Sequence, residues 1–420
     1  MLEDTILFFA ASFNTKVRCM NTFPLPSAEP ESLGFSTSGL AVIDAFFDRE
    51  ISASRLPGAV LAIAREGRLL HHKAYGLSDP AAGKPMKLDT VFALASMTKI
   101  MVSVAALRLM QEGRLPLKSR LDSYFPGFGR MKVGLDDGHG GMALFAQHRP
   151  IFIHDLLRHT AGITYGGRGI GPAAALWPAT SAVMFSDSAE SFIERITALP
   201  LTHQPGTAFE YGYSTDILGL VIEKVTGKRL RDYLSEILWK PLGMSQTGFE
   251  LTEERKARAA RPFSVSPVDG KPQAVTVAEQ QTSHDWGGAA ALGTVSDYLR
   301  FGQMLHDGGL FEGQRILSPQ VVALMTSDHL TGSMINTITL TEPHREGYGF
   351  GLGVAVRTRP GVAAVPGRVG EFSWNGAYGT IFFADPAEKL VVVAGTVAPG
   401  EIRKVYREQL QNLVYGAMTR

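Results

Sequence analysis

Strand-like sequence lies near both ends of this chain of 420 residues, and helix-like sequence fills the middle. Near the N-terminus, two apolar runs are joined by the short segment Arg65-Glu66-Gly67, which predicts a hairpin. A doubly wound parallel sheet would instead alternate strands and helices along the whole chain. We therefore expect an α+β fold in which both ends of the chain build one antiparallel sheet flanked by helices. The predicted strands are 58–64, 69–76, 349–357, 379–384 and 390–395.

The segment between these strands has the apolar spacing typical of helices, interrupted by loops rich in glycine and proline. We expect residues 99–285 to form an inserted all-helical or mainly helical lobe, with the active site where it meets the sheet. Residues 36–98 and 286–420 would form the α/β domain with the antiparallel sheet, and residues 1–35 a loose N-terminal extension. The predicted helices are 40–49, 100–110, 153–159, 189–198, 215–226, 230–238, 295–305 and 401–417.

Charge and cysteine content exclude several classes of partner. The 41 basic and 40 acidic residues leave a net charge of +1, and no stretch of Lys and Arg is dense enough to follow a phosphate backbone. The single cysteine, Cys19, cannot form an internal disulfide, and the 11 histidines show no paired clusters at ligand spacing. We therefore expect no nucleic-acid partner, no metal and no other cofactor.

The apolar run Ile6–Ala11 is short for a targeting signal. Glu3 and Asp4 precede it, where a secretory signal would carry positive charge. No window approaches the roughly 20 apolar residues of a membrane-spanning helix. We expect no membrane partner and a cytoplasmic location.

The most specific chemical feature is the S-x-x-K motif formed by Ser96 and Lys99. Residues three apart lie on one face of a helix, and the following segment, 100–110, is apolar on nearly every side. Burial of an amine disfavours its charged form, which would let Lys99 act as a base toward the Ser96 hydroxyl. The backbone N–H of Ser96, at the helix N-terminus, is a natural donor to an oxyanion. The alternative is that Ser96 caps the helix while Lys99 extends to water.

Seven motifs in order carry a wider resemblance, from about residue 36 to the C-terminus. They read FALASMTKIMVSVAALRLMQEGRLPL, IFIHDLLRHTAGI, PGTAFEYGYSTDILGLVIEKVTGK, PLGMSQTGF, WGGAAALGTVSDYLRFGQML, GYGFGLGV and FSWNGAYGTIFFADP. The chain resembles class C β-lactamases, DD-peptidases and above all the family VIII carboxylesterases that share their fold. The resemblance implies a β-lactamase/transpeptidase-like fold and a Ser96 nucleophile with a Lys99 base.

By this resemblance, Tyr211 takes the place of the tyrosine in the family's Y-x-N element, as second base or proton relay. A phenol in that role needs a neighbouring positive charge, and Lys99 would supply it. Tyr213 and Tyr165 are nearby candidates, but only Tyr211 lies at the right distance from Pro-Gly-Thr. Tyr213 stands where the family has Asn, and the resemblance makes it a substrate-binding residue.

The family's K-T-G element corresponds here to Trp374, Asn375 and Gly376, which the resemblance makes substrate-binding residues. The backbone N–H of Ala377 is the implied second oxyanion donor, beside that of Ser96. The W-x-G form is known from family VIII esterases, and an uncharged Trp gives no reason to favour a substrate that carries a carboxylate.

These features predict a serine carboxylesterase that hydrolyses short-chain acyl esters of small molecules through an acyl-enzyme. Alternatives are a β-lactamase or DD-peptidase, an acyltransferase with a small-molecule acceptor, and a non-catalytic binding protein of the same fold. His159 in Arg-His-Thr-Ala-Gly is expected to be structural, and the absence of G-x-S-x-G argues against an α/β-hydrolase. The oligomeric state stays open.

Overall fold

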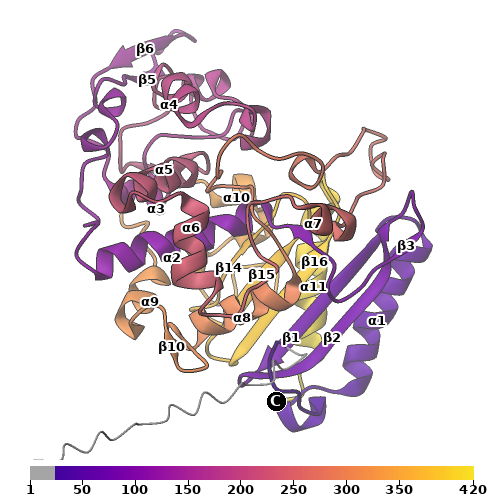
Figure 1. Cartoon of the computed structure of the whole chain (residues 1–420). Helices are drawn as coiled ribbons and strands as arrows, with labels where there is room; N and C mark the ends of the chain where they lie inside the picture. The colour runs from indigo at the N-terminus through magenta and orange to yellow at the C-terminus, as the bar shows by residue number, and fades with distance from the viewer. Residues whose placement is uncertain (1–23) are drawn as a thin grey trace, which may run out of the picture.

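An antiparallel sheet of eight strands organises the protein in a computed structural model, which describes residues 24–420 (Figure 1). The apolar run 6–11 and Cys19 lie outside the described residues. In spatial order the strands are β12 (Tyr348–Phe350), β13 (Ala355–Arg357), β14 (Phe372–Asn375), β15 (Ile381–Asp385), β16 (Leu390–Thr396), β1 (Gly58–Arg65), β2 (Arg68–Asp79) and β3 (Lys84–Pro85).

The two ends of the chain meet at the pairing of β1 with β16, where Ala62 lies opposite Val393. This pairing confirms the antiparallel sheet predicted from the distribution of strands. The single run predicted at 349–357 is instead two strands, β12 and β13, which pair with each other. The chain reverses between them at Gly353, whose φ of +96° favours glycine.

Both faces of the sheet are covered by helices. On β1, Leu61 and Ile63 pack under α1 (Thr37–Ser52) and α11 (Ile402–Gly416), whereas Val60 and Ala62 face the larger core on the other side. That second core contains α2 (Thr98–Gln111) and α8 (Val295–His306). Because successive side chains point to opposite faces, a strand that is apolar throughout becomes the centre of a three-layer arrangement.

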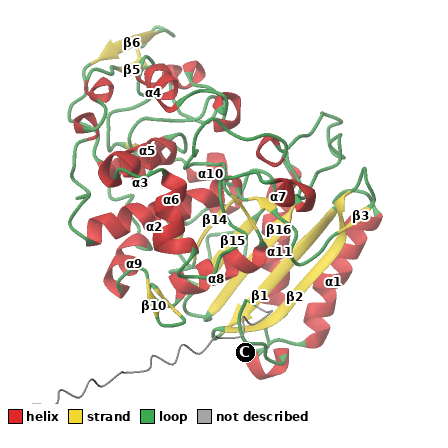
Figure 2. Cartoon of the chain, in the orientation of Figure 1, coloured by secondary structure: helices red, strands yellow, loops and turns green. Residues whose placement is uncertain are grey.

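The inserted lobe lies beyond α2 and is mainly helical, as Figure 2 shows. Its helices are α3 (Ile153–Leu157), α4 (Ala189–Thr197), α5 (Ser214–Thr226) and α6 (Leu230–Leu234) with a π-helical continuation over Ser235–Trp239. The next helix, α7 (Glu253–Arg258), lies by the sheet domain, where Val91 pairs with Ala259 (Figure 1). The lobe also holds a hairpin of β5 (Val133–Asp136) and β6 (Met142–Phe145), so it is not all-helical as expected.

Short elements complete the described chain and tie the lobe to the sheet domain. The parallel pair β7 and β11 joins the lobe to a segment from the C-terminal half, and β4 pairs with β8 beside the nucleophile segment. These elements are β4 (Phe92–Ala93), β7 (Ala208–Phe209), β8 (Leu292–Gly293), β9 (Leu310–Phe311), β10 (Gln314–Arg315), α9 (Pro319–Met325), β11 (Ile335–Asn336) and α10 (Ile338–Thr341).

Residues 24–35 pack against the sheet domain and do not form the loose extension expected from the sequence. Leu25, Leu33 and Phe35 are buried, and the N–H of Ala28 donates to the carbonyl of Leu69 at 3.0 Å. Pro30 begins a short 3-10 helix, Pro30–Leu33, and the apolar residues of the segment are buried against the sheet domain.

Candidate active site

Ser96 lies in a single 3-10 turn, Ala95–Met97, that leads directly into α2. Ser96 is half-buried, and the preceding Ala95 has a φ of +46°, which is uncommon for a residue other than glycine. The turn is held from outside: the Tyr298 hydroxyl donates to the carbonyl of Met97 at 2.9 Å. The first N–H groups of a helix have no acceptor within it, so the Ser96 N–H is suited to a ligand oxygen.

Lys99 is buried one turn after Ser96, with 1% of its surface exposed. Its Nζ donates to the carbonyl of Gly288 at 2.6 Å and to the Tyr165 hydroxyl at 3.2 Å. The same nitrogen lies 4.8 Å from the centre of the Tyr211 ring. The sequence alternative in which Lys99 extends to water is therefore wrong.

Behind Lys99 lies a buried carboxylate that the sequence analysis did not single out. The Tyr165 hydroxyl lies 2.9 Å from Ser181 Oγ, which is 3.1 Å from Oδ2 of Asp216 on α5. The other carboxylate oxygen, Oδ1, accepts from the N–H of Gly288 at 2.8 Å. Burial raises the pKa of Asp216, and the nearby Lys99 opposes this. The only sequence signal was an acidic residue inside the apolar stretch of α5.

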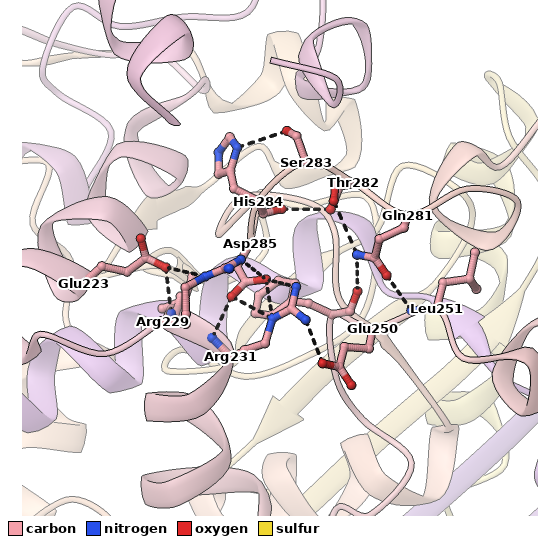
Figure 3. A network of polar contacts seen from close by, with 12 residues as sticks. Glu223, Arg229, Arg231, Glu250, Leu251, Gln281, Thr282, Ser283, His284 and Asp285 are labelled. Atoms are coloured by element: carbon pink, nitrogen blue, oxygen red, sulfur yellow. Dashed lines mark hydrogen bonds and ion pairs between the residues drawn. The ribbon is translucent and has the colours of Figure 1, made fainter. Parts of the chain in front are cut away.

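The backbone at Gly288 is positioned by a polar network in the preceding segment, residues 281–285 (Figure 3). Asp285 accepts from the Arg231 side chain at 2.6 Å and from its backbone N–H at 3.0 Å, and Arg229 lies 3.5 Å away. A Cβ on Gly288 would lie 2.3 Å from the Asp216 carboxylate, so glycine is needed there. The network thus fixes the carbonyl that binds Lys99.

Tyr211 lies between Lys99 and strand β14, and is almost fully buried. Its hydroxyl accepts a hydrogen bond of 3.0 Å from Nε1 of Trp374, and the centres of the two rings are 4.9 Å apart. Trp374 therefore contacts the predicted proton relay directly. The indole N–H stabilises negative charge on the phenol oxygen without adding a cation.

The end of β14 packs closely against the nucleophile turn. A Cβ on Gly376 would lie 2.6 Å from the carbonyl oxygen of Leu94 and 2.0 Å from Thr380 Oγ1, so no larger residue fits without movement. Ala377, which follows, is exposed. The segments that carry the two predicted oxyanion donors therefore lie next to each other.

Positive charge lies behind β14. Arg407 on α11 donates from Nη2 to the carbonyl of Gly376 at 2.5 Å and from Nη1 to Glu342. Burial alone would raise the pKa of Glu342, but Arg407 and its cationic neighbours lower it to about 2. Arg345 donates to Ser373 Oγ at 2.6 Å, and its guanidinium lies 5.2 Å from the centre of the Trp374 ring.

Comparison with known proteins places this arrangement in a family. The sequence model of the beta-lactamase family matches residues 43–409. The chain belongs to the beta-lactamase family. Its eight-stranded antiparallel sheet and flanking helices are the fold of that family and of the penicillin-binding-protein homologues.

Relatives within the beta-lactamase family include esterases. The chain is 29% identical to Esterase EstB of Burkholderia gladioli over 392 residues, which cover 87% of this chain and 93% of EstB. It is 35% identical over 352 residues to Protein Rv1367c of Mycobacterium tuberculosis strain H37Rv, covering 82% and 87% of the two chains. The solved structure of EstCE1, a hydrolase with promiscuous acyltransferase activity, superposes with a TM-score of 0.74 at 28% identity and covers 90% of this chain and 99% of EstCE1. The protein is a serine hydrolase of this family.

Most of the predicted site residues are brought together, but Tyr213 lies apart from them. Tyr213 is fully buried, its hydroxyl donates to the carbonyl of Pro178 at 3.1 Å, and its ring packs 4.6 Å from that of Tyr165. Asn375 is buried at the end of β14, beside Arg345. The structure places Tyr165, rather than Tyr213, against Lys99.

His159 lies under the Tyr211 ring, with ring centres 4.9 Å apart. Burial lowers the pKa of His159 well below its ordinary value, and its φ is +55°. His159 is 1% exposed and its ring packs against three other aromatic rings, which supports the predicted structural assignment.

Among residues 24–420, no group of three or more His, Cys, Asp or Glu side chains is arranged to hold a metal ion. Within the same residues, every helix is too short or too polar to cross a membrane.

Proposed function

We propose that the protein is a serine carboxylesterase that hydrolyses short-chain acyl esters through an acyl-enzyme on Ser96. The observation that carries the proposal is the environment of Lys99: it is buried one helical turn after Ser96, and two acceptors hold its nitrogen. A neutral amine has two N–H groups and one lone pair. With both N–H groups bound, the lone pair is free for the Ser96 hydroxyl.

In the first step, the Lys99 amine accepts the Ser96 proton, directly or through Tyr211, while Oγ bonds to the ester carbonyl carbon. The N–H groups of Ser96 and Ala377 stabilise the oxyanion. The proton then passes through Tyr211 to the leaving alkoxide, the carbon–oxygen bond breaks, and the alcohol departs. In the second step, water gives a proton to the same base while its oxygen bonds to the acyl carbon. The bond between that carbon and Ser96 Oγ then breaks, Oγ takes the proton back from the base, and the acid departs.

Two features support an ester over a β-lactam or a peptide as substrate. Trp374 occupies the place of the lysine that helps β-lactamases bind the substrate carboxylate, and it binds Tyr211 instead. Two relatives that match most of this chain, EstB and EstCE1, are described as an esterase and a hydrolase. Short acyl chains are favoured because Tyr211 and Trp374 pack closely at the reacting position.

The test is a series of p-nitrophenyl esters with acyl chains from C2 to C12, measured on the wild type and on Ser96→Ala. We expect Ser96→Ala to lose essentially all activity and the burst of nitrophenol that marks acylation. Ser103→Ala is the matched control, since Ser103 is buried on the same helix and its hydroxyl makes no hydrogen bond within the described chain. This control should behave as the wild type.

Equal activity of the Ser96→Ala and wild-type proteins would refute the mechanism, and a maximum rate with long chains would refute the short-ester assignment. Rapid opening of a chromogenic cephalosporin would instead favour a β-lactamase. Product analysis with an added alcohol acceptor separates hydrolysis from acyl transfer, which EstCE1 is described as performing promiscuously.

A further inference from the structure

Five residues close a ring of hydrogen bonds behind the proposed base. Lys99 Nζ donates to the Tyr165 hydroxyl, which lies 2.9 Å from Ser181 Oγ, and Ser181 lies 3.1 Å from the Asp216 carboxylate. The N–H of Gly288 donates to the other oxygen of Asp216, and its carbonyl accepts from Lys99. All four side chains are at least 95% buried, so water does not compete for these bonds.

The charge on Asp216 decides which group donates in each hydrogen bond from Asp216 through Ser181 and Tyr165 to Lys99. An ionised carboxylate can only accept, so the Ser181 hydrogen must point toward Asp216. Ser181 Oγ is then left as the acceptor for the Tyr165 hydrogen. Tyr165, having donated its only hydrogen, can face Lys99 only as an acceptor.

We propose that Asp216 is a positioning residue for Lys99, acting through Ser181 and Tyr165. This inference rests on the proposed function, since it assumes that Lys99 is the base for Ser96. When Tyr165 and Ser181 both donate toward Asp216, both N–H groups of the amine have acceptors and its lone pair is left for the Ser96 proton. If the hydrogen bonds ran the other way, Tyr165 would donate to that lone pair and block it.

Asp216 also stabilises the product of proton transfer. When Lys99 takes the Ser96 proton it becomes a buried cation, and the Asp216 carboxylate across the ring is close enough to interact with that charge. The aspartate of a Ser-His-Asp triad serves histidine in the same two ways, by orientation and by charge. Here a tyrosine and a serine transmit the orientation.

The central variant is Asp216→Asn, which keeps the shape but can donate to Ser181 and reverse the chain. We expect kcat to fall on the order of 100-fold, the size of a general-base contribution, with KM changed less than about threefold. Tyr165→Phe removes one acceptor of Lys99 and should act in the same direction, and Ser181→Ala breaks the connection to the carboxylate.

Asp297→Asn is the matched control. Asp297 is another buried carboxylate, bound to Thr247 Oγ1 at 2.9 Å, and it is not a member of the ring. Its replacement should lower the melting temperature without changing kcat. This control separates the effect of burying an amide from the effect of reversing the hydrogen bonds to Lys99.

The dependence of kcat on pH distinguishes the proposed role of Asp216 from a merely structural one, which would not change it. The charged and titratable groups that act on Asp216 or respond to it are Lys99, Tyr165 and Tyr213. Protonated Asp216 can donate, as Asn can, so the ratio of wild-type to Asp216→Asn kcat should shrink toward one as pH falls through the pKa of Asp216. The tyrosines do not titrate in that range, because burial raises both pKa values.

A folded Asp216→Asn protein with wild-type kcat and a ratio independent of pH overturns the inference. If this variant does not fold, wild-type kcat in both Tyr165→Phe and Ser181→Ala overturns it equally. The proposed function fails separately, through an active Ser96→Ala protein, so the two failures are distinguishable.

Discussion

The two halves of the active site differ in the groups they use: one consists of side chains and the other of backbone groups. The half proposed to handle protons comes from α2 and the helical lobe, and it is a series of hydrogen-bonded side chains that ends on the Asp216 carboxylate. The half proposed to stabilise the oxyanion comes from the end of β14, and it presents a backbone N–H backed by Arg407. The difference teaches that proton transfer depends on residue identity, whereas oxyanion binding depends on close backbone packing.

Removing the base should have the largest effect. Lys99→Met keeps the length of the side chain but takes away the group that accepts the Ser96 proton, so we expect kcat to fall about 10³-fold or more. Steady-state and burst kinetics with a p-nitrophenyl ester measure this loss. The control is Lys73→Met, at a half-exposed lysine paired with Asp44, and an active Lys99→Met protein would contradict the proton-handling assignment.

The second largest effect should come from widening the contact between the end of β14 and the nucleophile turn. Gly376→Ala places a Cβ 2.6 Å from the backbone carbonyl oxygen of Leu94, so β14 must shift away from the nucleophile turn. We expect a loss of kcat of about 100-fold, the size found when one oxyanion donor is removed, together with a lower melting temperature. Gly416→Ala, where the added Cβ meets nothing within 4 Å, should leave kcat unchanged. Similar kcat values in the two variants would show that close packing is not required.

A smaller effect should follow from Arg407→Met, which tests the support behind that donor. In a trans peptide the Gly376 carbonyl and the Ala377 N–H point in opposite directions, so a cation on the carbonyl polarises the N–H. We expect kcat to fall about tenfold, the size of one charge-assisted hydrogen bond.

Arg407→Met also leaves Glu342 buried without its partner, which should lower the melting temperature. The double variant Arg407→Met/Glu342→Gln should recover much of the stability but not the rate. Recovery of both would mean that Arg407 acts only through stability.

The smallest effect concerns acid stability on the oxyanion side. Burial lowers the pKa of His344, which lies beside Glu342, from 6.5 to about 3. Between these values the unfolded chain binds more protons than the folded one, so the free energy of unfolding falls as pH drops from about 6.5. His344→Gln should show a shallower fall of melting temperature between pH 7 and pH 4.5, measured by calorimetry. His139→Gln, at an exposed site, should keep the wild-type slope, and equal slopes in all three proteins would contradict the burial of a neutral His344.

Local sequence patterns were sufficient to predict much of the fold. The apolar runs of β1 and β16 predict strands buried on both faces. The helix α2 is recognisable because its own residues are apolar on nearly every face. The hairpin of β5 and β6 was missed because each strand is only four residues long and does not alternate apolar and polar residues regularly. Likewise, the prolines of residues 24–35 suggested a loose segment, while burial of three apolar residues holds it in place.

The sequence by itself determined that Ser96 and Lys99 share one helical face, because a spacing of three residues is a local property of a helix. It also determined the order of the motifs, and with them the family. The tertiary structure alone decided what holds Lys99, since its two acceptors lie 66 and 189 residues away and follow no periodic pattern. It also decided that the Lys99 amine bonds to the Tyr165 hydroxyl while the Tyr211 hydroxyl bonds to Trp374, because hydrogen-bond partners in a buried site depend on which segments the fold brings together.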